Sequence, residues 1–319
     1  MADKRLVTVC TASRSEKHLV APIIKRIAES PRLELDLLSL DPTLPFHEIV
    51  RLAESRLGEY EPSIVLIPTD RREMVPVAMV SFFLNIPTFH FLGGTYSYSM
   101  THDDVSRHVI SMFSHIVFVE SEKARELLVS AGEEPWRVKT VGTTHFDDVD
   151  IDESLCPREP YDLLLMNPLP LSLWRTNMDV KTALRMLGAV SVAIGPNEDP
   201  YGHLVKERLT KYREKHPAST LYLNGLPRHQ FLGLLKNCRR FISNSSSGLY
   251  EAPYFNIPVV NPSMRNSERT PPQKDMLKGA ADKVVRELED IELNEMLLAK
   301  RYRSGAWLST RLRESQIAV

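Results

Sequence analysis

The sequence predicts an α/β protein made of two Rossmann-like parallel-sheet domains that face one another across a cleft. Short apolar runs alternate with longer stretches of helical periodicity along the whole chain, which is the pattern of βαβ units. The chain has 319 residues, a length typical of two domains. An acidic stretch at residues 147–162, which includes two prolines, interrupts the alternation near the middle, as expected of an interdomain linker.

The first half is predicted to form one sheet with its connecting helices. We expect strands at residues 5–10, 33–39, 64–68, 88–92, 115–119 and 138–141. We expect helices at residues 19–29, 46–59, 75–84, 103–113 and 122–131. Each strand is bounded by turn residues or by a helical pattern. Residues 1–150 are therefore predicted to form an N-terminal domain.

The second half repeats this scheme. We expect strands at residues 163–166, 190–194, 220–223, 240–243 and 259–260. We expect helices at residues 177–187, 204–216, 228–236 and 249–255. Residues 151–160 are predicted to be the linker and residues 161–319 the C-terminal domain. The stretch at 291–312, rich in Leu, Arg and Glu, predicts helices that close this domain or cross back to the first.

Composition argues against several classes of partner. The chain has 40 basic and 41 acidic residues, so no global field favours nucleic acid or an anionic membrane. It contains no apolar run of 18 residues and no signal-peptide core at its start. Cys10, Cys156 and Cys238 lie far apart, so we expect neither a disulfide framework nor a zinc site. The prediction is a cytoplasmic protein without a metal.

Four loops that follow predicted strands hold the candidate site residues, because ligands of open parallel sheets bind at the carboxyl ends of the strands. The first is "TASRSE", residues 11–16, in which small residues precede Arg14. An arginine there can offer its planar fork to a phosphate or its face to a nucleobase. The alternative is a solvated arginine at a helix start.

The second and third loops carry carboxylates. Asp70 in "PTDRREM" can cap a helix, or it can act as a base or orient a substrate hydroxyl. The third loop, "FHFLGGTYSYSMTHDD", brings Thr95, His102, Asp103 and Asp104 to the start of a predicted helix. Carboxylates also stabilise a helix N-terminus by their charge, which is the purely structural alternative.

The fourth loop, "FISNSSSGLYEAPYF", is predicted to bind phosphate. Ser245, Ser246, Ser247 and Gly248 directly follow an apolar strand and precede a predicted helix. Small residues at a helix start allow an anion to approach the unpaired backbone N–H groups. Glu251, one turn later, would point to the same place and accept from ribose hydroxyls. The alternative is an N-cap cluster with a Glu that faces solvent.

These motifs, in this order, resemble those of the hydrolysing UDP-N-acetylglucosamine 2-epimerases, in the branch that feeds sialic-acid-type sugar biosynthesis. "TASRSE" is similar to T-G-T-R-A-E, "PTDRRE" to G-D-R-x-E, and "HFLGGT" to H-I-H-G-G-E. "DDVSRH" is similar to D-D-x-I-R-H, and "SNSSSGLYEAPYFNIPVVN" to G-N-S-S-S-G-I-I-E-A-P-S-F-x-I-P-V-V-N. The resemblance implies the two-domain glycosyltransferase-B type fold.

The resemblance also implies roles for individual residues. It places UDP against the residues Arg14, Ser246, Ser247, Gly248 and Glu251, with Arg265 and Arg269 in the loop after the final strand. It places Asp70, and Asp103 or Asp104, in the catalytic region, with no cofactor. A homodimer is implied by analogy alone.

Two substitutions alter the half of the site that would handle the sugar. Thr95 stands where the family has a glutamate, and Asn167 where it has a histidine near the diphosphate. A threonine hydroxyl cannot exchange protons near neutral pH. Asp70, His102, Asp103 and Asp104 are then the available proton-transfer groups.

We therefore predict an enzyme that eliminates UDP from a UDP-sugar and inverts C2, giving N-acetylmannosamine or, with an altered substrate, a related sugar. Two alternatives stay open on the same fold. One is a glycosyltransferase, in which Thr95, His102 and the "TYSYSM" loop bind an acceptor. The other is a nucleotide-sugar-binding protein without catalytic activity.

Overall fold

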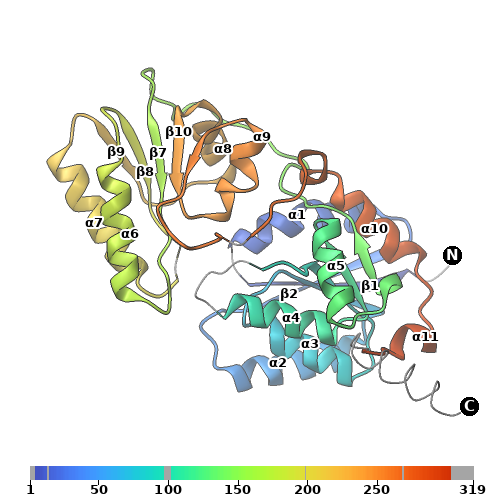
Figure 1. Ribbon diagram of the computed structural model, residues 1–319. Helices are drawn as coiled ribbons and strands as arrows, with labels where there is room; N and C mark the ends of the chain where they lie inside the picture. The colour runs from blue at the N-terminus through green and yellow to red at the C-terminus, as the bar shows by residue number, and fades with distance from the viewer. Residues whose placement is uncertain (1–3, 13, 97–101, 198, 268, 303–319) are drawn as a thin grey trace, which may run out of the picture. The chain divides into compact units, whose positions relative to one another are not determined.

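The structure is a computed structural model that describes residues 4–302 except 13, 97–101, 198 and 268 (Figure 1). By their internal contacts the described residues form two compact units. The first comprises those within Met1–Thr95, Asp103–Asp147 and Asp275–Val319, and the second those within Tyr96–His102 and Asp148–Lys274. Each unit contains one fully parallel sheet, as predicted.

The first unit has a six-stranded sheet in the order β2-β1-β3-β4-β5-β6. Its strands are β1 Arg5–Thr11, β2 Leu33–Ser39, β3 Ile64–Pro68, β4 Thr88–Gly93, β5 Ile116–Val119 and β6 Val138–Thr140. Its helices are α1 Arg14–Glu29, α2 Phe46–Tyr60, α3 Met74–Phe83, α4 Asp103–Phe113, α5 Glu122–Ala131, α10 Ala280–Asp290 and α11 Glu295–Leu298, with 3₁₀ turns η1 Pro135–Arg137 and η3 Lys274–Leu277.

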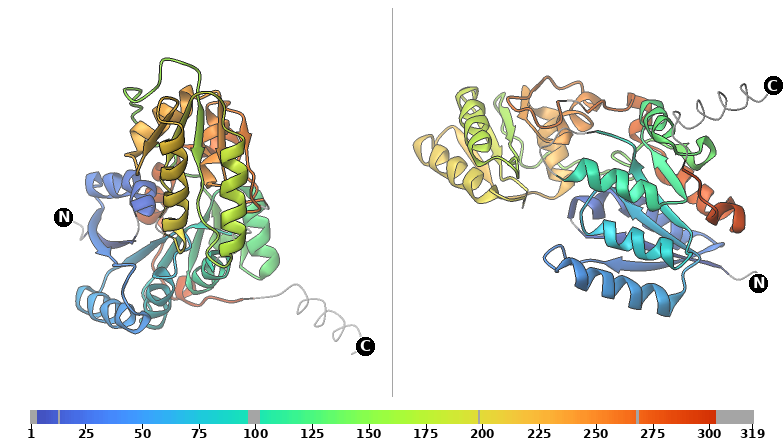
Figure 2. Two further views of the ribbon diagram at one scale, coloured as in Figure 1. Left: turned by 90° about the vertical axis from the view of Figure 1, so that its left-hand side faces the viewer. Right: turned by 60° about the horizontal axis from the view of Figure 1, so that its bottom comes forward.

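Both faces of this sheet are covered, because alternate strand residues pack in opposite directions. Ile64 and Leu66 of β3 pack with α1 and α10, whereas Val65 and Ile67 pack with α2, α3 and α4. The helices α2, α3 and α4 lie side by side in Figures 1 and 2. Near-continuous apolar strands are therefore buried on both sides, as parallel sheets require.

The second unit has a five-stranded sheet in the order β11-β10-β7-β8-β9. Its strands are β7 Asp162–Leu165, β8 Ser191–Ile194, β9 Thr220–Leu223, β10 Arg240–Ser243 and β11 Val259–Val260. Its helices are α6 Leu173–Arg185, α7 Gly202–Lys215, α8 Arg228–Asn237 and α9 Glu251–Tyr254, with the 3₁₀ turn η2 Ser246–Gly248. Its core joins the sheet to α6 and α7.

Some predicted elements are wrong in extent. α1 begins at Arg14 rather than at residue 19, and α6 begins at Leu173 rather than at 177. The helix predicted at 249–255 is instead the 3₁₀ turn η2 followed by the four-residue α9. α10 was not predicted, although its apolar residues Ala281, Val284, Val285 and Leu288 follow a helical period. Of the stretch 291–312, the described part contains only the short α11.

The C-terminal segment groups with the first sheet rather than with the second. The sequence assigned residues 161–319 to the second domain, with last helices that close it or cross back to the first. The contacts place the described residues from Asp275 to Tyr302 in the first unit. α10 supplies Ala280, Val284 and Leu288 to the core that α1 shares with the sheet.

Among the described residues, no helix combines the length and the apolar character needed to cross a bilayer.

The predicted linker is a packed segment. The Asp152 N–H donates to His229 O of α8 at 3.0 Å. A Cβ on Gly233 of α8 would lie 1.9 Å from Asp152 O. A side chain at residue 233 would therefore push the linker off the helix.

We expect Gly233→Ala to destabilise the protein by about 1–3 kcal/mol, the usual cost of overpacking. The measurement is the thermal midpoint by calorimetry, which should fall by several degrees. Gly58→Ala is the matched control, because Gly58 is exposed in α2 and a Cβ added there would meet open space. It should stabilise the protein by about 0.5–1 kcal/mol. Equal midpoints for the two variants would contradict this reasoning.

Candidate functional site

The centre of the first unit's site is the buried guanidinium of Arg107 on α4. Arg107 is 1% exposed, and it forms an ion pair with Asp70 directly after β3. Its Nη1 donates to Asp104 Oδ1 at 3.0 Å and to Thr95 O at 2.5 Å. The structure thus brings together three predicted residues, Asp70, Asp104 and Thr95, through one arginine that the sequence reasoning did not select.

The two carboxylates remain accessible while the arginine is enclosed. The side chains of Asp70 and Asp104 are each 23% exposed. A buried cation without partners would destabilise the folded protein by roughly several kcal/mol. The ion pairs with Asp70 and Asp104 offset that cost, and they hold the two carboxylates beside Arg107. Their exposed parts can still meet a ligand at the carboxyl end of the sheet.

The backbone before Asp70 is strained. Thr69 has φ 61°, a left-handed conformation that is unusual for a β-branched residue and costs on the order of 1–3 kcal/mol. Three hydrogen bonds hold it there. Its N–H donates to Phe91 O at 2.8 Å, its hydroxyl donates to Glu16 Oε1 at 2.7 Å, and its carbonyl accepts from His90 Nε2 at 2.6 Å.

His90 is neutral and its tautomer is fixed by its partners. Burial, opposed by the bond to Thr69 O and assisted by the charge of Arg107, lowers the pKa of His90 to about 3. Because Nε2–H donates to Thr69 O, Nδ1 accepts from the Ser111 hydroxyl at 2.9 Å. His90 is fully buried on β4, so its role is to hold the turn rather than to touch a substrate.

The glycine loop after β4 places Thr95. Leu92 and Gly94 have φ 67° and 80°, and a Cβ on Gly93 would lie 2.5 Å from Val117 Cγ1. Only glycine fits at 93, so the chain can pass close to β5. Thr95 is 7% exposed, and its hydroxyl has no hydrogen-bond partner among the described residues. That hydroxyl can therefore donate to or accept from a ligand.

The other predicted residues of this region lie at or next to the starts of α1 and α4. Arg14 is the first residue of α1, and its side chain lies outside the described residues. His102 is exposed directly before α4. Asp103 and Asp104 occupy the first turn of α4, where carboxylates favour the helix dipole. Most of the "TYSYSM" loop, residues 97–101, also lies outside the described part.

In the second unit, asparagine side chains connect the loops at the carboxyl ends of the strands. Asn244, after β10, accepts the Asn167 N–H at 2.7 Å and donates to Asn167 O at 2.8 Å. Asn167, after β7, accepts the Asn197 N–H at 3.0 Å. Asn266, after β11, donates to Asn244 O at 2.9 Å. Asn167 therefore organises this edge of the sheet through its amide.

The predicted serine cradle is partly closed by its own hydrogen bonds. Ser245 Oγ accepts the Ser247 N–H at 3.3 Å, and Ser245 O accepts the Gly248 N–H at 3.1 Å. The Ser246 N–H has no partner among the described residues. The Ser245 hydroxyl also donates to Ser247 Oγ at 3.3 Å. The half-buried hydroxyls of Ser246 and Ser247 and one N–H are thus available, instead of a full set of backbone donors.

The side chain of Glu251 is buried and paired with an arginine from outside the serine turn. It is 3% exposed and forms an ion pair with Arg228 at the start of α8, with Nη1 2.8 Å from Oε1. The predicted ribose carboxylate is therefore a buried residue with a cationic neighbour. Arg228 was not selected from the sequence, and no local motif indicated it.

The two arginines after β11 lie over the same edge. Arg265 donates to Pro168 O at 2.9 Å and lies 3.4 Å from Asp199 Oδ2. Arg269 lies over the ring of the buried Tyr250, with 5.0 Å between its guanidinium carbon and the ring centroid. Both are partly accessible, so positive charge is available beside the serine turn.

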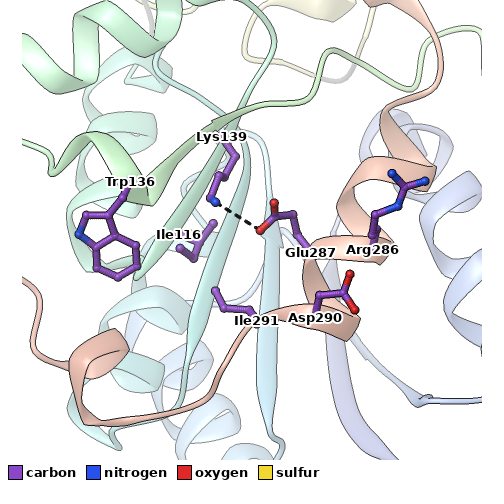
Figure 3. Close-up of a pocket in the computed structure, with 7 residues that line it drawn as sticks. All are labelled: Ile116, Trp136, Lys139, Arg286, Glu287, Asp290 and Ile291. Atoms are coloured by element: carbon purple, nitrogen blue, oxygen red, sulfur yellow. Dashed lines mark ion pairs between the residues drawn. The ribbon is translucent and has the colours of Figure 1, made fainter.

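A pocket of about 270 Å³ lies elsewhere on the first unit, near the start of β5 and the end of α10 (Figure 3). Its lining residues are Ile116, Trp136, Lys139, Arg286, Glu287, Asp290 and Ile291. Lys139 and Glu287 form an ion pair across it at 3.6 Å. It contains none of the predicted site residues.

Across the described parts of the chain, no group of three His, Cys, Asp or Glu residues could hold a metal ion.

Comparison with known proteins gives the family. The family model described as UDP-N-acetylglucosamine 2-epimerase matches residues 5–304. The chain belongs to this family. The recognition made from the motifs is therefore confirmed, and so is the predicted fold class of two parallel-sheet α/β domains.

Individual relatives carry related names. The chain is 32% identical over 218 residues to the GDP/UDP-N,N'-diacetylbacillosamine 2-epimerase (hydrolyzing) of Campylobacter jejuni, a match that covers 64% of this chain and 56% of the relative. It is 30% identical over 243 residues to the UDP-N,N'-diacetylbacillosamine 2-epimerase (hydrolyzing) of Legionella pneumophila, which covers 70% and 62%. The matched stretch thus spans about three fifths of these relatives.

A solved structure supports the fold. The UDP-GlcNAc 2-epimerase of Neisseria meningitidis, crystallised with UDP-GlcNAc, superposes with a TM-score of 0.69 at 15% identity. The match covers 99% of this chain and 100% of that one. At this identity the likeness concerns the fold alone.

The buried His90 gives a pH prediction. An unfolded histidine takes up a proton below its ordinary pKa of 6.5, whereas folded His90 resists protonation down to about 3. Stability should therefore fall as pH drops from 6.5 towards 3, by about 1.4 kcal/mol per pH unit from this group. His115, whose pKa burial lowers to about 4, adds to the slope.

Urea unfolding of wild type and His90→Gln at several pH values between 4.5 and 7 tests this expectation. The variant should show the smaller pH slope, because glutamine does not titrate and His115 is retained. His47→Gln, at an exposed position on α2, is the control and should keep the full slope. A wild-type slope in His90→Gln would contradict the expectation.

Proposed function

We propose that the chain is a hydrolysing 2-epimerase that acts on a UDP-linked 2-acetamido sugar. The observation that carries the proposal is the pair of accessible carboxylates, Asp70 and Asp104, held on the buried Arg107 at the carboxyl end of the first sheet. Family membership and the names of the Campylobacter and Legionella relatives support the reaction and the sugar class.

The reaction has two stages. A base removes the C2 proton while the C1–oxygen bond breaks and its electron pair leaves on the diphosphate, which gives UDP and a glycal. In the second stage a carboxylic acid gives its proton to C2 from the opposite face and water adds its hydroxyl to C1. The remaining proton of the water restores that acid, and the base releases the proton it took to solvent. We assign the first proton transfer to Asp70 and the second to Asp104, because proton exchange requires groups that titrate. His102 and Asp103 are the other candidates nearby in sequence.

Thr95 contributes differently in this proposal. Its hydroxyl is buried and has no partner among the described side chains and backbone groups, which suits a hydrogen bond to the sugar. It cannot replace a carboxylic acid in proton transfer. We therefore expect the sugar to be bound by Thr95 and the protons to be handled by the carboxylates.

We propose that the second unit binds the nucleotide. The hydroxyls of Ser246 and Ser247, the Ser246 N–H and the guanidinium groups of Arg265 and Arg269 would bind the diphosphate, which gains charge as it leaves. Ser245 would support them by holding the turn. Glu251, beside Arg228, and Gly248, where a Cβ would lie 3.0 Å from Val259 Cγ1, would shape the ribose side. Asn167 would hold the loops in register.

The test is UDP release from UDP-N-acetylglucosamine and from UDP-N,N'-diacetylbacillosamine, with NMR of the released sugar. We expect UDP and the 2-epimer from at least one of them. Asp70→Asn should lower kcat by about 10²–10⁴-fold, the usual effect of losing an acid–base group, and leave UDP affinity by calorimetry within about threefold. Asp41→Asn, at an exposed loop position, is the control.

Two outcomes would contradict the proposal. UDP binding without any release would indicate a binding protein. Release that depends on an added acceptor would indicate a glycosyltransferase. Location in the cytoplasm is retained as a prediction from the sequence.

We also propose a homodimer that forms through α3 and α4. Every residue of α3 that is not buried is apolar, and beyond Asp103 and Asp104 the accessible residues of α4 are four apolar ones and His108. Phe82 and Phe83 contact Phe113, with ring centroids 5.7 and 6.1 Å apart, so the two helices form one surface. We call it the apolar helix face; its members are Val75, Met79, Phe82, Phe83, Val105, Val109, Met112 and Phe113.

This face suits a second copy of itself. A two-fold axis sets the same patch of each subunit against the other. Charges in that patch would be buried without opposite charges, and the apolar helix face carries none. Burial, followed by the charge of Arg107, lowers the pKa of His108, so it is neutral at pH 7. Phe83 is 70% and Val105 68% exposed in the single chain, which is unusual for large apolar groups without a partner.

Light scattering after size exclusion should therefore give twice the 36.3 kDa of the chain. Phe83→Lys should give the monomer, because it would bury an unpaired charge in an apolar interface. Met296→Lys, at another residue that is 70% exposed, should stay dimeric. A monomeric wild type, or a dimeric Phe83→Lys, would refute this interface.

A further inference from the structure

Thr69 connects two loops of the first unit, at the carboxyl ends of β1 and β3. Its hydroxyl donates to Glu16 Oε1 at 2.7 Å, and Glu16 Oε2 accepts the Ala12 N–H at 3.1 Å. Glu16 is 2% exposed, so this carboxylate is enclosed by protein. It cannot meet a substrate directly, yet its partner Thr69 directly precedes the proposed base.

The left-handed backbone of Thr69 explains why such a contact matters. A β-branched residue at φ 61° tends to return to the extended region, and that rotation would swing the following residue, Asp70, away from Arg107. Of the three hydrogen bonds on Thr69, two involve its main chain and one its hydroxyl. Glu16 therefore supplies the restraint that depends on the side chain at 69.

We infer that Glu16 is a positioning residue for Asp70, and that it acts by holding Thr69 in the left-handed conformation. The inference rests on the proposed function, in which Asp70 is the base. It assigns Glu16 no contact with substrate and no proton transfer. Loss of Glu16 should therefore lower the rate only while residue 69 is a residue for which positive φ is unfavourable.

Glycine at position 69 separates this role from a general structural one. Glycine adopts positive φ without strain and has no hydroxyl, so it removes both the need for Glu16 and the bond to it. If Glu16 instead serves only the loop at Ala12, its loss should have the same effect whichever residue stands at 69. A double-mutant cycle measures this difference.

The experiment compares wild type, Glu16→Met, Thr69→Gly and the double variant by UDP release. Methionine keeps the length of the side chain and removes both acceptor oxygens. With Thr69 present, we expect Glu16→Met to lower kcat at least 30-fold and to change KM less than threefold. In the Thr69→Gly background, the same substitution should lower kcat less than threefold. Equal losses in both backgrounds would overturn the inference.

Two further variants test the hydroxyl itself. Thr69→Val keeps the branched shape and loses the donor, so it should lower kcat as Glu16→Met does. Thr69→Ser keeps the donor and should restore most of the rate. If Thr69→Val is as active as Thr69→Ser, the hydrogen bond to Glu16 does not position Asp70.

Thermal midpoints of the four proteins in the double-mutant cycle decide the matter without turnover. Glu16→Met should lower the midpoint clearly with Thr69 present and much less in the Thr69→Gly background. If wild type releases no UDP while this coupling is found, the proposed function fails and the link between Glu16 and Thr69 stands. If the midpoint losses are equal in the two backgrounds, the link itself is refuted.

Discussion

The first unit depends on the burial of one guanidinium. Arg107 is enclosed by α4 and by the loops after β3 and β4, and its charge is balanced by Asp70 and Asp104. Removing one partner of such a group leaves charge in a poorly hydrated place, which is costly. The loops must therefore converge on the arginine. That convergence brings both carboxylates to one guanidinium and orders the carbonyl of Thr95.

Two residues with strained backbones lie where the sheet of this unit meets that cluster. Thr69 and Leu92 both adopt positive φ, at or directly after the carboxyl ends of β3 and β4. Such conformations persist only when their surroundings fix them. At Thr69 a neutral histidine, a buried glutamate and a main-chain bond to Phe91 O of β4 do so. The sheet thus fixes the position of Asp70 through the residues that bond to Thr69.

The second unit uses a different method to order its loops. Its turn at Ser246–Gly248 satisfies most of its own N–H groups, so it is a preformed support rather than an open ring of donors. Asn244, Asn167 and Asn266 connect three loops by amide groups that are both donors and acceptors. An amide can serve this purpose without charge. Asn167 takes part in this network through its main chain, which pairs with the Asn244 amide, and through Oδ1, which accepts the Asn197 N–H.

The sequence by itself determined the two parallel sheets and the order of most helices and strands, because periodicity and turn residues act over short distances along the chain. It indicated the loops that carry the candidate site. It also predicted Asp70, Asp104 and Thr95 from motifs. Only the tertiary structure decided that Arg107 joins these three, that Arg228 pairs with Glu251, and that α10 packs on the first sheet. The arginines and their partners are separated by up to 37 residues. Buried charges pair with the groups that lie near them in the folded structure, and no local sequence pattern indicates which groups those are.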